Sequence, residues 1–211
     1  HIIGRGFTKA EPVTRSHLFR AHGSTPFEFR IEPTPLLSPG PEGSEDELGV
    51  EDPTLVPCDC CGRAVLFSRV RRMRAEEAGR YRRSTDNLGV VVSLGIVHHL
   101  FDGKKPEKNT LLSTEHQLWW EKPIDMCKEA EIVPSASRKG SSLLFYEFAD
   151  GRRSRKAACT FSDSLRYPTW RGCRLWLHPH WQTWDSDHVS TGPVVPFGDR
   201  HLMFYNGRGG G

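Results

Sequence analysis

Short apolar runs bounded by turn residues recur along this chain and predict β-strands rather than long helices. Residues 27–31 alternate apolar and polar side chains with period two, as expected of a half-buried strand. Asp150-Gly151, placed between the apolar runs 143–148 and 155–161, is the strongest short-range signal for a β-hairpin. Further aliphatic or aromatic runs predict strands at 64–70, 89–97, 174–178 and 201–205.

Helical patterns are confined to two segments. One is 74–82, and the other runs from about 114 to 132, where Ser113 could cap the helix and Pro123 would divide it. The sequence therefore predicts an α+β fold, mainly antiparallel β with short helices and long irregular arms.

The composition predicts two unequal parts. Residues 1–57 are expected to form an extended arm and an acidic loop rich in proline and glycine, and residues 58–211 a mixed, mainly-β globular domain. The segment 33–57 has too few apolar residues to order itself, so a partner is expected to hold it. The longest apolar run, 88–100, is too short to cross a bilayer as a helix, and no membrane span is predicted.

Charge is segregated within a chain whose formal net charge is only +3. The stretch from Glu42 to Asp52 holds six acids and no base, and residues 63–83 hold eight arginines against Glu76 and Glu77. Such a basic segment attracts phosphate or an acidic partner. The candidates for nucleic-acid or partner binding are Arg69, Arg71, Arg72, Arg74, Arg80, Arg82 and Arg83.

Three cysteines crowd into four residues and predict a metal half-site. Cys58 and Cys61, followed by Gly62, have the spacing with which a tight turn presents two thiolates to one zinc ion. The remaining ligands would come from the other cysteines or from histidines, the candidates being Cys127, Cys159, Cys173, His98, His99 and His116. The alternative is that these cysteines are reduced structural thiols in a non-oxidising compartment, with no cofactor bound.

Two enzyme readings compete with a structural role. His99, Asn109 and His116 follow one another in an order that resembles the HNH endonuclease signature, although the second cysteine pair of that signature is absent. The resemblance implies a metal-dependent nuclease in which a histidine activates water and another binds the metal.

The second enzyme reading starts at His1. An amino-terminal histidine can chelate copper through its amine and its ring, and His98 or His99 could supply a second ligand, with Phe204 or Tyr205 as the axial group. This arrangement resembles the histidine brace of secreted lytic polysaccharide monooxygenases.

Residues 167–204 interleave tryptophan with arginine and histidine, which favours packing and interfaces over catalysis. Because no catalytic set is complete, the sequence favours a non-catalytic accessory subunit of a large assembly. The expected setting is a mitochondrial ribonucleoprotein such as the ribosome, with other subunits and rRNA as partners, because residues 1–30 are rich in Arg, Ser and Thr.

Overall fold

The computed structural model describes residues 2–8, 14–25, 27–77, 89–113, 126–134, 141–149, 154–161, 165, 168–180 and 182–209. Nearly all regular structure in this part is strand, and its one helical element is the 3-10 turn η1 (Ala75–Glu77). The strands are β1 (Ile2–Thr8), β2 (Arg15–Thr25), β3 (Glu28–Ile31), β4 (Gly49–Cys58), β5 (Gly62–Arg72), β6 (Val90–His98), β7 (Glu107–Leu112), β8 (Met126–Pro134), β9 (Ser142–Ala149), β10 (Ser154–Phe161), β11 (Trp170–Leu177), β12 (His188–Phe197) and β13 (Arg200–Arg208).

The α+β prediction is wrong, because the fold is almost entirely β. The end of the helix expected from about 114 to 132 is strand β8, and residues 114–125 lie outside the described residues. Of the helix expected at 74–82, the 3-10 turn η1 is present, and residues 78–82 are outside the described part. In β8, Cys127, Ala130 and Val133 are buried at intervals of three, which imitates a helical period.

Most of the expected strands are confirmed. The runs at 64–70, 89–97, 174–178 and 201–205 fall largely within β5, β6, β11 and β13. Strands β9 and β10 pair antiparallel from Ala149 and Ser154 to Ser142 and Phe161, as the predicted hairpin requires, and its turn, residues 150–153, lies outside the described residues.

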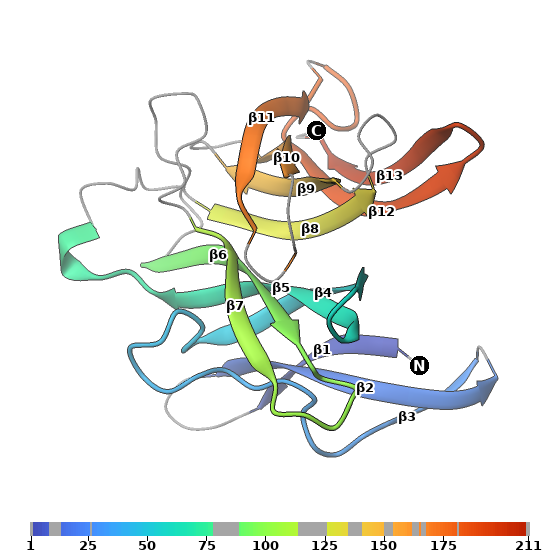
Figure 1. Ribbon diagram of the computed structural model, residues 1–211. Helices are drawn as coiled ribbons and strands as arrows, with labels where there is room; N and C mark the ends of the chain where they lie inside the picture. Colours follow the sequence, from blue (N-terminus) through green and yellow to red (C-terminus); the bar gives the residue numbers. More distant parts are fainter. Residues whose placement is uncertain are drawn as a thin grey trace.

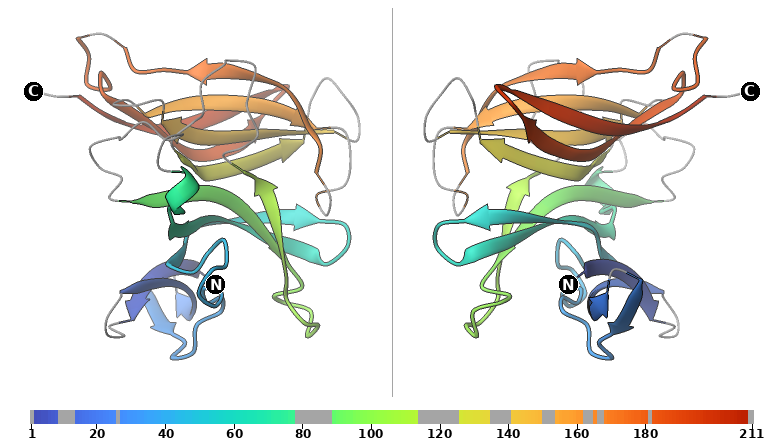
Figure 2. Two further views of the ribbon diagram at one scale, coloured as in Figure 1. Left: turned by 90° about the vertical axis from the view of Figure 1, so that its left-hand side faces the viewer. Right: turned by 90° about the vertical axis from the view of Figure 1, so that its right-hand side faces the viewer.

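The strands form four antiparallel layers that lie one upon another (Figures 1 and 2). The first layer holds β1–β3, the second β4–β7, the third β8–β11 and the fourth β12 and β13. Within the second and third layers, consecutive strands are neighbours. Single parallel pairings join one layer to the next, and these are Ser16 with Gly49, Val92 with Met126, and Ser154 with His188.

Apolar side chains fill the space between the layers. Leu18, Val50 and Phe67 belong to the cluster between the first and second layers. Leu66 and Tyr146 belong to the largest cluster, between the second and third layers. A small cluster around Val133 and Phe145 packs against the fourth layer. Consecutive residues of one strand therefore pack into different interfaces, as Leu66 and Phe67 do. Strands buried on both faces read as continuous apolar runs in the sequence.

Residues from the expected arm, 1–57, contribute to the core in the part that the structure describes. Leu18 of β2 is fully buried, and its backbone N–H donates to the carbonyl oxygen of Leu37 at 3.0 Å. Val50 of β4 is fully buried as well, so these residues belong to the core. The domain boundary expected between residues 57 and 58 falls inside β4.

The architecture combines sheets packed face to face, as in a β-sandwich, with a repeated unit. Strands β4, β8 and β12 each begin a layer, and β8 contacts β4 on one side and β12 on the other. Antiparallel sheets whose first strands lie side by side are the arrangement that β-propellers repeat around an axis. No helix in the described part is long and apolar enough to cross a membrane.

Candidate active site

The first strands of three layers are each interrupted by a β-bulge a few residues after the strand begins. One extra residue interrupts the pairing between Glu51 and Thr54 in β4, and the same shift recurs in β8 and β12. In the first two bulges an acidic residue takes a left-handed backbone conformation, Asp52 with φ 48° and Glu129 with φ 49°. Such conformations are disfavoured for residues other than glycine and gather at functional sites. The bulges thus re-aim two carboxylates.

The three bulges meet at one cavity of about 250 Å³. Its lining is mostly polar and comprises Asp52, Pro53, Thr54, Glu129, Ala130, Glu131, Thr191 and Asn206. Residues from all three first strands therefore face the same space, because those strands lie side by side. A polar hollow with three acids is suited to a ligand rich in hydroxyl groups.

The carboxyl group of Asp52 has a perturbed pKa. Burial raises the pKa of its carboxyl group above the ordinary value, and the negative charges of Glu129 and Glu51 raise it further. The Ser68 hydroxyl donates to Oδ2 of Asp52 at 2.8 Å and acts in the opposite direction. The side chain is still 24% exposed, so the group can reach a ligand in the cavity.

Hydrogen bonds from the first layer hold Glu51, the acid next to Asp52, in place. Glu51 accepts a hydrogen bond from Arg5 at 2.8 Å and another from the Ser16 hydroxyl at 2.8 Å. Arg5 Nη1 also lies 3.8 Å from Oδ1 of Asp52. Strand β1 of the first layer thereby places the guanidinium group of Arg5 beside Asp52.

Glu129 is held from the fourth layer. The hydroxyl of Thr191 donates to its backbone carbonyl oxygen at 2.7 Å, across the interface between β8 and β12. Lys128 Nζ lies 3.8 Å from Oε1 of Glu129 and 3.8 Å from Oε1 of the fully buried Glu147. Asp52 and Glu129 are therefore supported by separate strands yet line one cavity.

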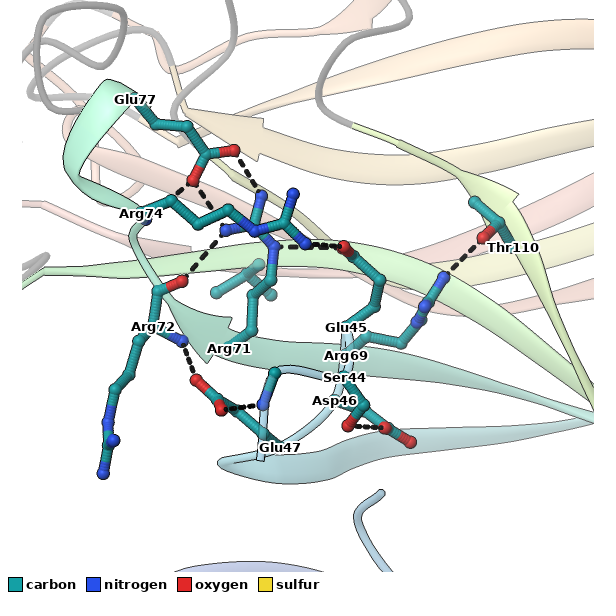
Figure 3. Close-up of polar contacts among 12 residues, drawn as sticks. Ser44, Glu45, Asp46, Glu47, Arg69, Arg71, Arg72, Arg74, Glu77 and Thr110 are labelled. Carbon is teal, nitrogen blue, oxygen red and sulfur yellow. Dashed lines mark hydrogen bonds and ion pairs between the residues drawn. The ribbon is translucent and has the colours of Figure 1, made fainter. Parts of the chain in front are cut away.

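None of these acids was among the sequence-predicted site residues, and the arginines that were lie elsewhere. Arg71 is buried and forms two hydrogen bonds with Glu77, at 2.7 and 2.6 Å, and one with Glu45 at 3.0 Å (Figure 3). The hydrogen bonds from Arg71 lower the pKa of Glu77 to about 2. The paired carboxylate in turn raises the pKa of Arg71.

The acidic loop, residues 42–47, supplies most of the other partners of the basic segment. Arg74 donates to Glu45 at 2.9 Å, and Arg72 lies 3.5 Å from Glu42. Glu47 accepts from the backbone N–H of Arg72 at 3.0 Å (Figure 3). The loop is therefore ordered by the chain's own basic segment.

Arg69 also points to a neighbour within the chain. It donates to the hydroxyl of Thr110 at 2.6 Å, and burial lowers its pKa (Figure 3). Arg80, Arg82 and Arg83 lie outside the described residues.

The predicted metal half-site is part of a larger cluster. Nδ1 of His98 lies 3.4 Å from the sulfur of Cys58, 3.6 Å from that of Cys60 and 3.8 Å from that of Cys61. All four ligand atoms lie within 4.8 Å of one another, so the group could hold a metal ion. Cys58 and His98 are buried, and Cys60 is exposed. The sequence identified Cys58 and Cys61 but did not select Cys60.

Neither enzyme pattern is complete within the described residues. Nδ1 of His99 is paired with Asp102 at 2.7 Å, and Asn109 donates to Glu107 at 3.4 Å. His116 lies outside the described residues, and so does His1, the anchor of the copper reading.

Comparisons with known proteins identify the class of fold. No protein-family model matches the sequence, and a search of curated proteins finds no significant match. Solved structures of glycoside hydrolases and mannoside phosphorylases do match the fold. A β-1,2-mannobiose phosphorylase from Listeria innocua, in complex with β-1,2-mannobiose, has a TM-score of 0.66 and 16% identity, over 93% of this chain and 46% of that one.

Two further solved structures have the same fold. A putative glycosidase from Bacteroides thetaiotaomicron has a TM-score of 0.63 and 15% identity, over 96% of this chain and 57% of its own. Another belongs to the GH130 family of mannoside phosphorylases, which contains glycoside hydrolases that target β-1,2-mannosidic linkages in Candida mannan. It has a TM-score of 0.62 and 17% identity, over 96% of this chain and 55% of its own. The chain thus spans about half the length of these proteins, and the likeness establishes the fold.

These likenesses correct the functional prediction. The expectation of a non-catalytic, RNA-binding structural subunit of a ribosome is wrong, because the structural neighbours are glycoside hydrolases and phosphorylases. The expectation that the protein is not an enzyme is corrected on the same finding. The basic segment had suggested an RNA-binding surface. In the structure, however, Arg71, Arg72 and Arg74 have acids of this chain as partners.

Proposed function

We propose that this protein cleaves glycosidic bonds, by hydrolysis or by phosphorolysis, with Asp52 as its general acid. The observation that carries the proposal is a carboxyl group of raised pKa that lines the same cavity as a second acid, Glu129. Glycosidases use such a pair, in which one carboxyl group holds a proton and the other stays ionised. The fold of the matched enzymes supports the proposal.

In the proposed reaction, Asp52 protonates the oxygen of the scissile bond while that bond to the anomeric carbon breaks. In hydrolysis, Glu129 accepts a proton from the water that attacks the anomeric carbon. In phosphorolysis, inorganic phosphate attacks instead, and the product is a sugar 1-phosphate. Arg5, 3.8 Å from Asp52, would stabilise the carboxylate that is left after proton transfer.

The matched enzymes that act on β-1,2-mannosides make such disaccharides the first substrates to test. The full chain is incubated with β-1,2-mannobiose, with and without inorganic phosphate, and mannose and mannose 1-phosphate are quantified. A parallel series uses a dinitrophenyl mannoside, whose leaving group needs no protonation.

Asp52→Asn is expected to lower kcat/KM on the disaccharide by about 100- to 10,000-fold, the usual contribution of a general acid. The same variant should keep most of its activity on the dinitrophenyl substrate, because that step bypasses the acid. Asp199→Asn is the matched control, since the Asp199 side chain is 94% exposed and lies outside the cavity lining.

Glu129→Gln separates the two reactions. If water is the nucleophile, the variant should lose activity on both substrates. If phosphate is the nucleophile, phosphate-dependent cleavage of the dinitrophenyl substrate should persist. Equal activities of Asp52→Asn and Asp199→Asn on the disaccharide, or no turnover of any glycoside by the unaltered chain, would contradict the proposal.

A further inference from the structure

Four side chains that commonly bind metals converge at one end of the second layer. Cys58 ends β4, Cys60 and Cys61 lie in the turn between β4 and β5, and His98 ends β6. Strand β5 pairs with both β4 and β6, so the ends of its two neighbours lie on either side of it. The cluster joins parts of the chain that are about 40 residues apart in sequence.

The turn is shaped to present two sulfurs together. Cys58 pairs with Gly62 across a three-residue loop, and Gly62 has φ 73°. Glycine adopts this left-handed conformation without strain, and here it allows the chain to turn sharply into β5. The side chains of Cys60 and Cys61 thereby turn back toward the end of β4, where Cys58 is.

The distances fit a tetrahedral zinc ion. Zinc bonds of about 2.3 Å to sulfur and about 2.0 to 2.1 Å to nitrogen place a sulfur and a nitrogen about 3.6 Å apart at a tetrahedral angle. The three sulfur-to-Nδ1 distances are 3.4, 3.6 and 3.8 Å. The sulfurs of Cys58 and Cys60 are closer, at 3.0 Å, and need to separate by less than about 1 Å for the ideal spacing.

We propose that Cys58, Cys60, Cys61 and His98 bind one zinc ion in a closed structural site. Three thiolates and one imidazole select zinc over magnesium or calcium, which prefer oxygen ligands. Four protein ligands complete the tetrahedron and leave no position for substrate, so the ion is structural rather than catalytic. The ion ties the β4–β5 turn to the end of β6. One of its ligands, Cys58, is the last residue of β4, the strand that also carries Asp52.

Metal content and a cobalt probe test the site on the full chain. Protein purified without added metal or chelator should contain one zinc per chain by elemental analysis and native mass spectrometry. After removal of zinc under reducing conditions, one equivalent of Co²⁺ should give the thiolate charge-transfer and visible bands of a tetrahedral site, and zinc should abolish them. This measurement on the unaltered chain decides the proposal even if a variant fails to fold.

Substitutions assign the ligands. Cys60→Ser and His98→Ala should each weaken zinc binding by at least about 100-fold, more than the loss of an outer-shell partner does. Two controls should bind like the unaltered chain. His99→Gln removes the adjacent histidine, and Cys127→Ala removes a thiol that lies in the core.

Chelation completes the test. EDTA should lower the melting temperature of the unaltered chain but leave that of the Cys58→Ser/Cys61→Ser double variant unchanged, because metal-binding energy adds to folding energy. Substoichiometric zinc together with octahedral cobalt spectra would overturn the proposal. A disulfide between Cys58 and Cys60 that persists in reductant, or an iron–sulfur chromophore, would overturn it as well.

Discussion

The buried ion pair between Arg71 and Glu77 gives a stability prediction whose size follows from the structure. The two side chains are 7% and 6% exposed and are joined by two hydrogen bonds. The pair lowers the pKa of Glu77 from 4.5 to about 2. One pKa unit corresponds to about 1.4 kcal/mol, so ionised Glu77 stabilises the folded state by about 3 kcal/mol at pH 7.

The pH dependence has a defined sign. Because the pKa of Glu77 is lower in the folded state, its stabilisation is complete above about pH 5 and disappears as the pH falls toward about 2. Glu77→Gln should therefore cost about 3 kcal/mol at pH 7, and about half of that at pH 3. The neighbouring Glu76 is exposed in the same turn, and Glu76→Gln should stay within about 0.5 kcal/mol.

Urea-induced unfolding at pH 7 and at pH 3, followed by tryptophan fluorescence and circular dichroism, measures both effects. Coincident transitions by the two probes are required for the free energies to be compared. A Glu77→Gln variant as stable as Glu76→Gln at pH 7 would refute the reasoning. A large loss that did not change with pH would refute it too, since the loss would then come from packing rather than charge.

Three other outcomes are expected. Since the pKa of Asp52 is raised in the folded state, its ionisation costs stability, and Asp52→Asn should melt above the unaltered chain at pH 7 but together with it near pH 3. Gly95→Ala should cost about 1 to 3 kcal/mol in chemical denaturation, because a Cβ would lie 2.6 Å from Cζ of Phe67, whereas Gly4→Ala, with no atom within 4 Å, should not destabilise. Burial raises the pKa of the Cys127 thiol to about 12, so mass spectrometry should find it unalkylated at pH 8 until the chain unfolds.

Local apolar patterns were enough to place many strands, because each strand needs only a few neighbouring residues to be recognisable. They could not place β8 correctly. Its bulge adds one residue at Glu129, which shifts the alternation and spaces the buried Cys127, Ala130 and Val133 as in a helix. A period-of-two rule fails wherever a strand carries such a bulge.

The arginine-rich segment predicts a binding surface for partners when the sequence is considered alone, because a single sequence does not show which distant segments pair with each other. The acids of 42–47 and the arginines of 69–74 meet only because the loop before β4 lies beside the end of β5 (Figure 3). Strand pairing also brings His98 to Cys58, which is why the sequence could name His98 only as one of six candidates for the remaining ligands.

The sequence contains a short repeated tripeptide whose copies lie next to the cavity. Leu55-Val56-Pro57, Ile132-Val133-Pro134 and Val194-Val195-Pro196 are three copies of an aliphatic-Val-Pro tripeptide. Each lies in the first strand of a layer, after the bulge. Their unequal spacing hides them from a search for a fixed period.

Most of the cavity lining comes from the residues just before each copy. They include Asp52 and Glu129, with left-handed backbones, and Thr191 at the corresponding bulge of β12. A bulge that served only to bend the sheet would be satisfied by glycine, which adopts this conformation at no steric cost. Two acids accept the strain instead, and both line the cavity. Both strained positions therefore bring a carboxylate to the cavity.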